Sequence, residues 1–552
     1  ARERPGVLPY RLFALSNFGS LLALLAYPIA VEPVLSTRWQ SYIWSGLFIV
    51  FAALCSLLAW RGRNGVSIKL NETESTVTTH RGPSFSMRMA WIALAACPSI
   101  LMIADTSFLT ENIAPIPLLW VIPLALYLLS FIFCFERTGW YRRDVYLPLL
   151  ALGLGAMAYL PTLGISELPV YLSMGINLTS FFVACMVCHG ELARLKPHPS
   201  QLTTYFLMLA TGGAIGGLFV GVVAPYCFNS NFELSIGLVL TALVVTLVVL
   251  RGHQFTNPAR RGLAWATALT MTAGIAYVRI DDHLYELADA QVTSRNFYGT
   301  LRVFNGGDGV DARRTLMHGQ IVHGRQFATP TREDLPTAYY SEESGVGRAI
   351  AAKMAATQGA LRVGVVGVGV GTLLTYGRQG DVYRLYDIDP LVIQLARTEF
   401  TFFSRTKAKT EVVIADARLA LERETAQQFD VLVIDAFSGD AVPIHLLTKE
   451  AFASYFKHLK PDGVLAVHVT NRFLNLMPVV KTAADSFGKQ ARLISFEGDS
   501  DRLIFRSNWV VISATKDFFD QPWFKDVATP IEVRPGFKIW DDNYSSVLAV
   551  LK

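Results

Sequence analysis

The sequence predicts a multi-span α-helical membrane region followed by an α/β domain with a doubly wound, mainly parallel sheet. Three observations predict this class. Up to about residue 280 the apolar residues come in long blocks, and 52% of the 552 residues are hydrophobic. Strand-like and helix-like patterns alternate in the last third, and a glycine-rich turn follows the first of these strands. We expect a membrane region at 1–285, a small β-meander at 286–360 and the doubly wound domain at 361–552.

The first half contains eight apolar blocks that are long enough to span a membrane, because a spanning helix needs about 20 mostly apolar residues. The blocks are 10–31, 41–60, 88–108, 116–135, 145–163, 168–188, 202–226 and 232–250. A ninth stretch, GLAWATALTMTAGIAYV at 262–278, is marginal. We expect it to be helical and to lie along the membrane interface or at the edge of the bundle. Small residues in TGGAIGG at 211–217 predict a close helix contact.

The loops between these blocks alternate in charge. The N-terminus and the loops at 61–88, 136–143, 190–199 and 251–261 are basic, whereas the other loops are short and mostly neutral or acidic. The positive-inside rule therefore places the N-terminus in the cytoplasm. Eight spans return the second half of the chain to the cytoplasm, which we expect, whereas nine spans place it outside. Because the basic residues mark topology rather than a basic binding face, we expect no nucleic-acid partner.

All six cysteines lie in the first half, so no disulfide framework holds the second half. CMVCH at 185–189 matches the C-x-x-C-H pattern of covalent haem attachment. Haem is attached outside the cytoplasm, whereas the charge pattern places this helix end inside. We therefore expect Cys185, Cys188 and His189 to serve helix packing rather than haem. Asp105, at the end of the third block, is expected at the membrane interface rather than at membrane depth.

The stretch VGVVGVGVGTLLTYG at 363–377 predicts a nucleoside site. Gly367, Gly369 and Gly371 follow a predicted strand at 363–366, and the ligands of doubly wound sheets lie beyond the carboxyl ends of the strands. Glycine lets the backbone approach a ligand closely, and a helix expected after the turn offers free N–H groups at its N-terminus. The spacing G-x-G-x-G differs from the G-x-G-x-x-G of dinucleotide sites.

Acidic residues end the next two predicted strands, at 382–388 and 410–416. Asp387 in LYDIDP can accept hydrogen bonds from both ribose hydroxyls, and Asp416 in VVIADAR can accept one from an adenine amino group. The alternative is that these acids are helix N-caps and solvated strand ends. Because glycines and both acids occur in register, the pattern favours a single adenosine.

The fourth predicted strand, at 429–435, leads into the loop of FDVLVIDAFSGDAVP, and a fifth strand is expected at 463–469. Asp435 ends the fourth strand and Asp440 lies in the loop. A carboxylate there can take a proton from an amine nucleophile or hold a cationic one in place. We expect Asp440 to deprotonate or orient the amine, with Asp435 behind it fixing the loop.

The ordered set GVGVGT, DID, DAR, D-x-x-x-x-D-x-x-P and LKPDG resembles the spermidine synthase (polyamine aminopropyltransferase) family. SRNFYGTLRV, LMHGQIVHGRQ and PTAYYSE resemble its opening strand, its L-D-G-x-x-Q turn and its tyrosine-containing segment. The whole chain resembles bacterial fusions of a multi-span membrane region to such a domain. That resemblance implies a multi-pass protein of the bacterial inner (plasma) membrane.

The resemblance also implies a class I S-adenosylmethionine-dependent-transferase-like (Rossmann-like) fold. The implied reaction transfers an aminopropyl group from decarboxylated S-adenosylmethionine to a polyamine, and no metal is implied. The implied site residues are Gly367, Gly369, Gly371, Asp387, Asp416, Ala417 and Gln326 for the nucleoside, Tyr339, Tyr340 and Tyr544 for the amine, and Asp440 with Asp435 for catalysis.

Three positions depart from the motifs of this family. Val370 replaces an aspartate that helps to hold the aminopropyl ammonium, and His318 replaces the aspartate of the turn. Asp440 fits the catalytic loop only with two inserted residues. The adenosine half of the site is therefore better supported than the amine half, unless Asp541 or Asp542 supplies the missing acid.

Two alternatives to aminopropyl transfer stay open. The domain can transfer a methyl group from S-adenosylmethionine, since the same strand-end acids serve both cofactors. It can also be a catalytically degenerate binding subunit of a membrane complex or a transporter. The apolar helix faces can serve the lipid bilayer, a second copy in a homodimer, or a partner subunit equally well.

Overall fold

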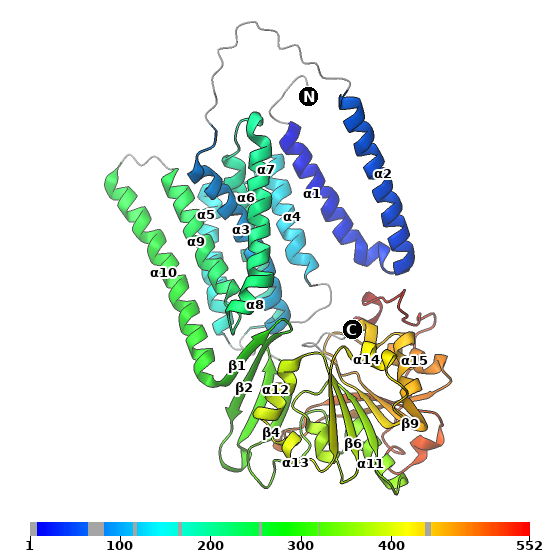
Figure 1. Cartoon of the computed structure of the whole chain (residues 1–552). Coiled ribbons are helices and arrows are strands. Elements are labelled where there is room, and N and C mark those ends of the chain that lie inside the picture. Colours follow the sequence, from blue (N-terminus) through cyan, green and yellow to red (C-terminus); the bar gives the residue numbers. More distant parts are fainter. Residues whose placement is uncertain are drawn as a thin grey trace, which may run out of the picture.

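The computed structural model describes residues 8–63, 82–113, 119–137, 139–163, 168–252, 257–319, 321–436 and 443–552. A bundle of long helices is followed along the chain by an α/β domain that lies against one end of the bundle (Figure 1). The predicted fold class, an apolar helical region followed by a mixed-sheet α/β domain, is confirmed.

The bundle is built from helices that are mostly as long as the apolar blocks. They are α1 (Leu8–Ala26), α2 (Thr37–Arg63), α3 (Phe85–Phe108), α4 (Val121–Glu136), α5 (Arg143–Tyr159), α6 (Val170–Arg194), α7 (Leu202–Leu218), α8 (Ala224–Cys227), α9 (Glu233–Arg251) and α10 (Pro258–Asp289). Short π-helical segments extend α1, α3 and α7: η1 (Tyr27–Val31), η2 (Leu109–Ile113) and η5 (Phe219–Val223).

Eight of the described helices are long and apolar enough to cross a membrane, and α4 is a shorter apolar helix. The marginal ninth stretch lies within α10, which is one of the eight and which packs against α9 and α5. It runs beside the bundle as a full-length helix and continues to Asp289, past the boundary that we expected at residue 285 (Figure 1). Counting α4, the chain therefore makes nine apolar helices in its described part before the α/β domain begins.

The core of the bundle forms around α3, which packs against α6, α7 and α9. The predicted small-residue contact is present, because a Cβ atom on Gly216 of α7 would lie 2.8 Å from the carbonyl oxygen of Ala96 in α3. Asp105, close to the C-terminal end of α3, is completely buried, and its expected position at the membrane interface stays a prediction. Its helix is covered by neighbours at that level, which the sequence alone does not show.

The segment CMVCH lies near the end of α6 in the interior of the bundle. Cys185, Cys188 and His189 are fully buried there. The His189 ring stacks on Phe131 with 3.6 Å between the centroids, and its Nδ1 shares a hydrogen bond of 2.8 Å with Ser130 Oγ. These contacts are those of helix packing.

The helices alternate in direction, so their ends gather at two levels. At the domain end, the backbone N–H of Thr37 at the start of α2 donates to the carbonyl oxygen of Asn543, and α10 leads directly into the first strand. At the far end, Arg143 at the start of α5 pairs with Glu191 near the end of α6 at 2.6 Å. Figure 1 shows the N-terminal end of α1 at this far end as well.

Ion pairs hold the domain against the bundle. Arg295 in the first strand pairs with Glu233 of α9 at 2.5 Å, and both side chains are at most 10% exposed. Arg302 pairs with Glu286 of α10 at 2.8 Å. Because such a buried pair is costly to break, the two parts are held in one arrangement.

The α/β domain opens with the predicted meander, a four-stranded antiparallel sheet in the order β1-β2-β3-β4. Its strands are β1 (Ala290–Asn296), β2 (Gly299–Gly306), β3 (Arg313–His318) and β4 (Ile321–Phe327). Helix α11 (Gly345–Ala356) then leads to a seven-stranded sheet in the order β10-β11-β9-β8-β5-β6-β7. The strands are β5 (Arg362–Val366), β6 (Val382–Asp387), β7 (Lys409–Ile414), β8 (Phe429–Ile434), β9 (Leu459–His468), β10 (Gln490–Phe496) and β11 (Ser507–Ser513).

The five strands that we predicted form the parallel part of this sheet, and β10 and β11 extend it by antiparallel pairing. Its β8 strand is buried throughout, and its residues alternate between two cores. Val431 and Val433 face the core that contains α11, whereas Leu432 and Ile434 face the core of α15 (Lys449–His458) and α16 (Met477–Ser486). Helices α12 (Pro390–Thr398), α13 (Phe402–Arg405) and α14 (Ala417–Arg423) follow β6 and β7.

The chain order reverses at β5, whose neighbours are β6 on one side and β8 on the other. Ligands of open α/β sheets lie in the crevice outside the carboxyl ends of the strands at such a switch point. The glycine-rich turn leaves β5 at this place.

Candidate active site

The glycine-rich turn has the backbone that its sequence predicts. Gly367, Gly369 and Gly371 have φ values of +88°, +54° and +86°, which side chains rarely adopt. A Cβ atom on Gly367 would also collide with the carbonyl oxygen of Asp435. The helix that we expected directly after the turn is the short 3₁₀ segment η7 (Thr372–Tyr376), with Gly371 as its N-cap.

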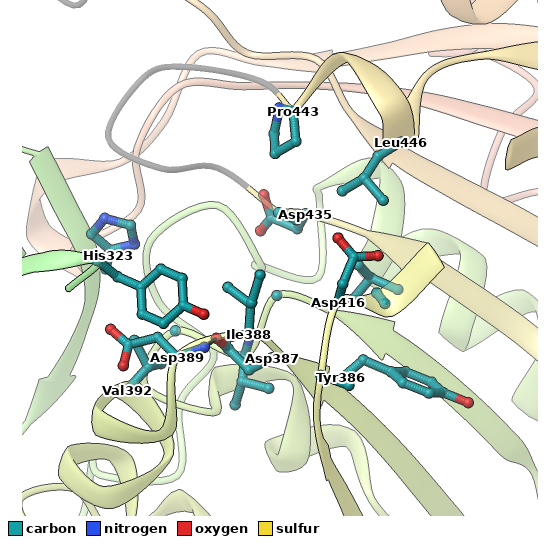
Figure 2. Close-up of a pocket in the computed structure, with 18 of the residues that line it drawn as sticks. His323, Tyr386, Asp387, Ile388, Asp389, Val392, Asp416, Asp435, Pro443 and Leu446 are labelled. Carbon is teal, nitrogen blue, oxygen red and sulfur yellow. Dashed lines mark hydrogen bonds between the residues drawn. The ribbon is translucent and has the colours of Figure 1, made fainter. Parts of the chain in front are cut away.

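A cavity of about 260 Å³ lies over the carboxyl ends of β5, β6, β7 and β8. We call it the nucleoside cavity. Its lining includes Gly367, Gly369, Asp387, Asp416, Ala417 and Asp435, which the sequence predicted for the site. Figure 2 shows Asp387, Asp416 and Asp435 arranged around this pocket, with His323 on its far side. Gly371 is not among the described residues that line the nucleoside cavity.

Asp387 is held by the backbone around it. Its Oδ2 accepts a hydrogen bond from the N–H of Val368 at 3.0 Å, and its Oδ1 accepts one from the N–H of Asp389 at 3.0 Å. Burial raises the pKa of Asp387 to about 6, although these two N–H groups favour the charged form. The carboxylate is therefore ionised at neutral pH and can accept hydrogen bonds from a ribose.

Asp416 combines the two roles that the sequence left open. Its Oδ1 caps α14 by accepting from the N–H of Leu419 at 2.9 Å. Its Oδ2 lies 2.9 Å from Nε2 of His445, which also lines the nucleoside cavity. The carboxyl group of Asp416 therefore caps α14 and also lines the nucleoside cavity.

A second cavity of about 480 Å³ adjoins the first. His323, Gly369 and Asp435 line both of them. The second cavity is also lined by the predicted Tyr339 and Tyr340. The two cavities therefore share a wall, in which Asp435 stands at the junction, and we call the pair the crevice.

Asp435 has a hydrogen-bond partner on each carboxylate oxygen. The Tyr340 hydroxyl donates to Oδ2 at 2.5 Å, and His468 Nδ1 lies 2.6 Å from Oδ1. Burial and the adjacent Asp435 raise the pKa of Tyr340 well above its usual range, so its hydroxyl stays protonated and donates. The His468 ring stacks on Trp509 with 4.6 Å between centroids, which fixes its plane.

Three further predicted positions lie elsewhere or outside the described residues. Gln326 lines neither cavity: its amide nitrogen donates to Thr401 Oγ1 at 2.7 Å, and its amide oxygen accepts from the Thr401 N–H at 2.9 Å. Tyr544 is also absent from both linings, and it is partly buried against the core of α15 and α16. Asp440 belongs to 437–442, outside the described residues.

The acids near Tyr544 do not supply a missing carboxylate. Asp542 pairs with Arg418 of α14 at 2.5 Å and accepts a hydrogen bond from Thr448 at 2.8 Å. Asp541 forms a turn with Tyr544 through its backbone. Neither residue lines either cavity as described.

Val370, which stands where the family has aspartate, does not face the nucleoside cavity. Its side chain is 1% exposed and packs directly on Gly324 of β4, where there is no room for a Cβ atom. The Val370 side chain therefore packs the glycine turn against β4 of the meander. No charge at residue 370 is available to hold a ligand.

Sequence reasoning missed three histidines of the site, namely His323, His445 and His468. His468 ends β9, next to β8, so the strand-end rule that identified Asp435 could have found it. Burial and the neighbouring His318 lower the pKa of His323 to about 4, so its ring is neutral at pH 7. His318, noted above as a departure, lines the nucleoside cavity.

A doubly wound sheet with a glycine turn and a cavity at its switch point defines a domain with the class I S-adenosylmethionine-dependent-transferase-like fold. The family model of the spermine/spermidine synthase domain matches residues 353–495. The α/β domain of this chain is spermidine synthase-like.

Two curated relatives match parts of the chain. A polyamine aminopropyltransferase of Vibrio vulnificus (strain CMCP6) is 34% identical over 86 residues, which is 15% of this chain and 28% of that protein. An N-terminal histidine N-methyltransferase of Emericella nidulans is 32% identical over 112 residues, which is 19% of each. The matched parts therefore span less than a third of either relative.

Two solved structures are also similar. A probable spermidine synthase from Corynebacterium glutamicum has 16% identity and a TM-score of 0.33, covering 40% of this chain and 79% of that one. A spermidine synthase from Thermotoga maritima has 17% identity and a TM-score of 0.31, covering 48% and 84%.

Proposed function

We propose that this chain is a membrane-anchored, aminopropyltransferase-like enzyme that binds an S-adenosyl compound in the nucleoside cavity. It transfers an alkyl group from the sulfonium to an acceptor in the second cavity. The observation that carries the proposal is the shared crevice, in which Asp387 faces the nucleoside side and Asp435 stands at the junction with the acceptor side. The family match supports the aminopropyl form of this reaction.

In this reaction the acceptor nitrogen attacks the carbon next to the sulfonium. The carbon–sulfur bond breaks, methylthioadenosine leaves, and the acceptor nitrogen gives up a proton. Because the sulfonium is already a good leaving group, the protein has mainly to align the two molecules and accept that proton. We assign the proton to the hydrogen-bonded pair of Asp435 and His468, with Tyr340 holding the second oxygen of Asp435. Asp440 remains our candidate for the group that orients the amine.

The proposal is tested with the full chain in detergent or nanodiscs. Methylthioadenosine release from decarboxylated S-adenosylmethionine is followed in the presence of amine acceptors. The Asp435→Asn variant should lose this release, whereas the control Asp526→Asn, an exposed aspartate away from the crevice, should keep it. Release that is the same in both variants would contradict the assignment.

Methyl transfer from S-adenosylmethionine is the second candidate, and the burial of Val370 favours it. A buried valine leaves no carboxylate at the position where the family holds the aminopropyl ammonium. The same assay separates the two reactions, because methyl transfer releases S-adenosylhomocysteine from S-adenosylmethionine. Tight nucleoside binding with neither release would identify the domain as a binding subunit.

We also propose that the α/β domain lies on the outer face of the bacterial inner membrane. The connections at the domain end, 32–36, 109–120, 160–169 and 227–232, contain no lysine or arginine, and Arg38 is a single basic residue in the first turn of α2 beside them. The basic loops belong to the far end, as the pairing of Arg143 with Glu191 and the position of the N-terminal end of α1 indicate (Figure 1). With nine helices the positive-inside rule therefore favours the periplasmic side, not the cytoplasmic side that eight spans predicted. On the outer face the domain is separated from the S-adenosyl compounds of the cytoplasm, so this placement supports the binding-subunit alternative, and measuring the side of the membrane helps to decide between binding and catalysis.

A further inference from the structure

A third cavity, of about 240 Å³, lies where the bundle meets the α/β domain, and we call it the interface cavity. Its walls come from the end of α3 with η2, from η5, α8 and α10, from the start of α9, and from the turn between β1 and β2. Figure 1 shows these elements at the junction of the two parts, with α8 beside β1. The cavity has room for a small organic molecule, because one water needs only about 10–15 Å³. It shares one wall residue, Tyr298, with the nucleoside cavity.

Both arginines of the interface cavity are paired with carboxylates. Arg295 pairs with Glu233 at 2.5 Å and also donates to the carbonyl oxygen of Ser230 at 2.8 Å. Arg279 pairs with Asp282 at 2.8 Å. The side chains of the two ion pairs are at most 10% exposed. The positive charges of the described lining are therefore neutralised within the protein.

Glu111 of η2 is the remaining charged residue of this lining, and it forms no ion pair with any described residue. Its Oε2 accepts from the amide nitrogen of Asn231 at 2.6 Å. The orientation of this amide is fixed, because its oxygen accepts from Thr300 Oγ1 at 3.1 Å. Within the described part of the chain Oε1 accepts no hydrogen bond. The residues 112–118 that follow in the chain, Asn-Ile-Ala-Pro-Ile-Pro-Leu, hold no charged side chain.

Two arginines act on Glu111 from beyond ion-pair distance. They are Arg295 and Arg302, and each is already paired with another glutamate. Arg295 pairs with Glu233, and Arg302 pairs with Glu286 at 2.8 Å. Because every arginine near the cavity has its own carboxylate, Glu111 gives the described lining one carboxylate in excess.

Most of the other lining residues are apolar, among them Ile103 of α3, Val220 of η5 and Leu234 of α9. The turn between β1 and β2 adds the rings of Phe297 and Tyr298, whose centroids are 5.5 Å apart. Aromatic faces attract ammonium groups, and apolar walls accommodate a methylene chain. Mg²⁺ and Ca²⁺ instead take six or more oxygen ligands. The lining therefore favours an organic cation over a metal ion.

We propose that the interface cavity binds a primary amine in its ammonium form, with Glu111 as the counter-ion. The ammonium donates a charge-assisted hydrogen bond to Oε1 of Glu111, and the carbon chain lies against the apolar wall. The carboxylate is partly buried, so salt screens this attraction less than it would at an open surface. The site is separate from the second cavity, and the inference does not rest on the proposed transfer reaction.

The test is photolabelling of the full chain in an uncharged detergent. The probe is a short alkylamine that carries a diazirine, and its matched control is the alcohol of the same carbon skeleton. Labelled peptides are identified by mass spectrometry. We expect the amine to label residues 103–111 or 295–299 at least about tenfold more than the alcohol does. Butylamine hydrochloride should displace the label, whereas sodium chloride at the same concentration should not.

Glu111→Gln keeps the shape of the side chain and removes its charge, so it should lower this labelling by about tenfold. The matched control is Glu136→Gln, at an exposed acid that ends α4 outside the lining, and it should leave labelling unchanged. Asp435→Asn should also leave it unchanged, because Asp435 lines only the other two cavities. Equal labelling by the amine and the alcohol in the wild type would overturn the proposal without any variant. Labelling that depends on Asp435 and not on Glu111 would overturn it as well.

The ammonium can belong to a free amine or to the headgroup of a membrane lipid. Phosphatidylethanolamine added to the detergent should suppress labelling if the lipid is the ligand, and phosphatidylglycerol, which has no ammonium, is the control. Suppression by phosphatidylethanolamine alone would support a lipid ammonium. Labelling that neither lipid changes would support a free amine. Displacement by sodium chloride as complete as that by butylamine would contradict both sources.

Discussion

Nδ1 of His468 lies 2.6 Å from Oδ1 of Asp435, and this contact joins the ends of the adjacent parallel strands β9 and β8. Since the ionised carboxylate accepts the Nδ1 proton, the contact fixes the orientation of the ring as well as its tautomer. The two residues are 33 positions apart in the sequence. They meet because parallel strands end at one edge of the sheet.

Replacing Asp435 by asparagine should lower the transfer rate by about 10²- to 10⁴-fold, the usual contribution of a positioned acid–base group. The variant keeps the shape of the side chain but removes the charge that orients His468. Methylthioadenosine affinity should change little, because Asp387 and the glycine turn remain. An unchanged rate at full saturation would show that Asp435 takes no part in the chemistry.

The raised pKa of Asp387 predicts a pH dependence of nucleoside binding. Below pH 6 the carboxyl group becomes protonated and loses its capacity to accept from two ribose hydroxyls. Affinity for methylthioadenosine should therefore fall about tenfold between pH 7.5 and pH 5. The Asp387→Asn variant, which cannot titrate at this position, should bind weakly with a flat profile. A wild-type profile that is equally flat would refute this role for the carboxylate.

The same pKa shift affects stability, with the opposite sign to the usual carboxylate. The folded-state value, about 6, lies above the ordinary value of 3.8, so the folded protein binds the proton more tightly than the unfolded chain. The contribution of Asp387 to stability is therefore greatest at low pH and declines as the pH rises from about 4 through 6. Asp387→Asn should make the melting temperature less dependent on pH across this window.

The glycine turn should be intolerant of side chains at Gly367. Alanine there must adopt a φ near +88° and would meet the carbonyl oxygen of Asp435, so we expect a loss of stability of about 1–3 kcal/mol. Gly359, which has open space around it, is the matched control, and Gly359→Ala should change stability by less than about 0.5 kcal/mol. Thermal unfolding of both variants checks this, and equal melting temperatures would contradict the account.

The side of the membrane can be measured with reporter fusions. Alkaline phosphatase joined after Lys552 should be active in intact cells, and green fluorescent protein at the same place should be dark. A fusion after Arg251, at the far end of the bundle, serves as the control and should give the reverse pattern. Fluorescence after Lys552 with inactive phosphatase would place the domain in the cytoplasm.

Much of the fold could be predicted, because periodicity and strand order are local properties of the sequence. The five parallel strands were predicted from their apolar runs, and in four of them glycine or aspartate marks the strand end. The length of α10 was underestimated, because the polar residues that follow the apolar stretch hide its continuation to Asp289. Arg279 and His283 of this part are buried. Burial by neighbouring helices likewise decided the environment of Asp105.

The second cavity as a whole could not be predicted, because its described lining comes from seven separate parts of the chain. Tyr340, His468 and Arg506 belong to different elements, and their proximity depends on how β11 and the meander pack against the parallel strands. The motif places Val370 in the glycine turn. The direction of its side chain depends on the contact with Gly324 of β4, a strand that lies outside the motif. Such long-range packing leaves no periodic signal.

The most direct test of the central claim is calorimetry of the full chain with methylthioadenosine, compared between the wild type and Asp387→Ala. The nucleoside cavity predicts saturable binding to the wild type. Removing a charge-assisted acceptor of the ribose should weaken that binding by about 1.5–3 kcal/mol, or roughly ten- to a hundredfold. No binding of methylthioadenosine or any S-adenosyl compound to the wild type, or equal binding to both proteins, would contradict the account.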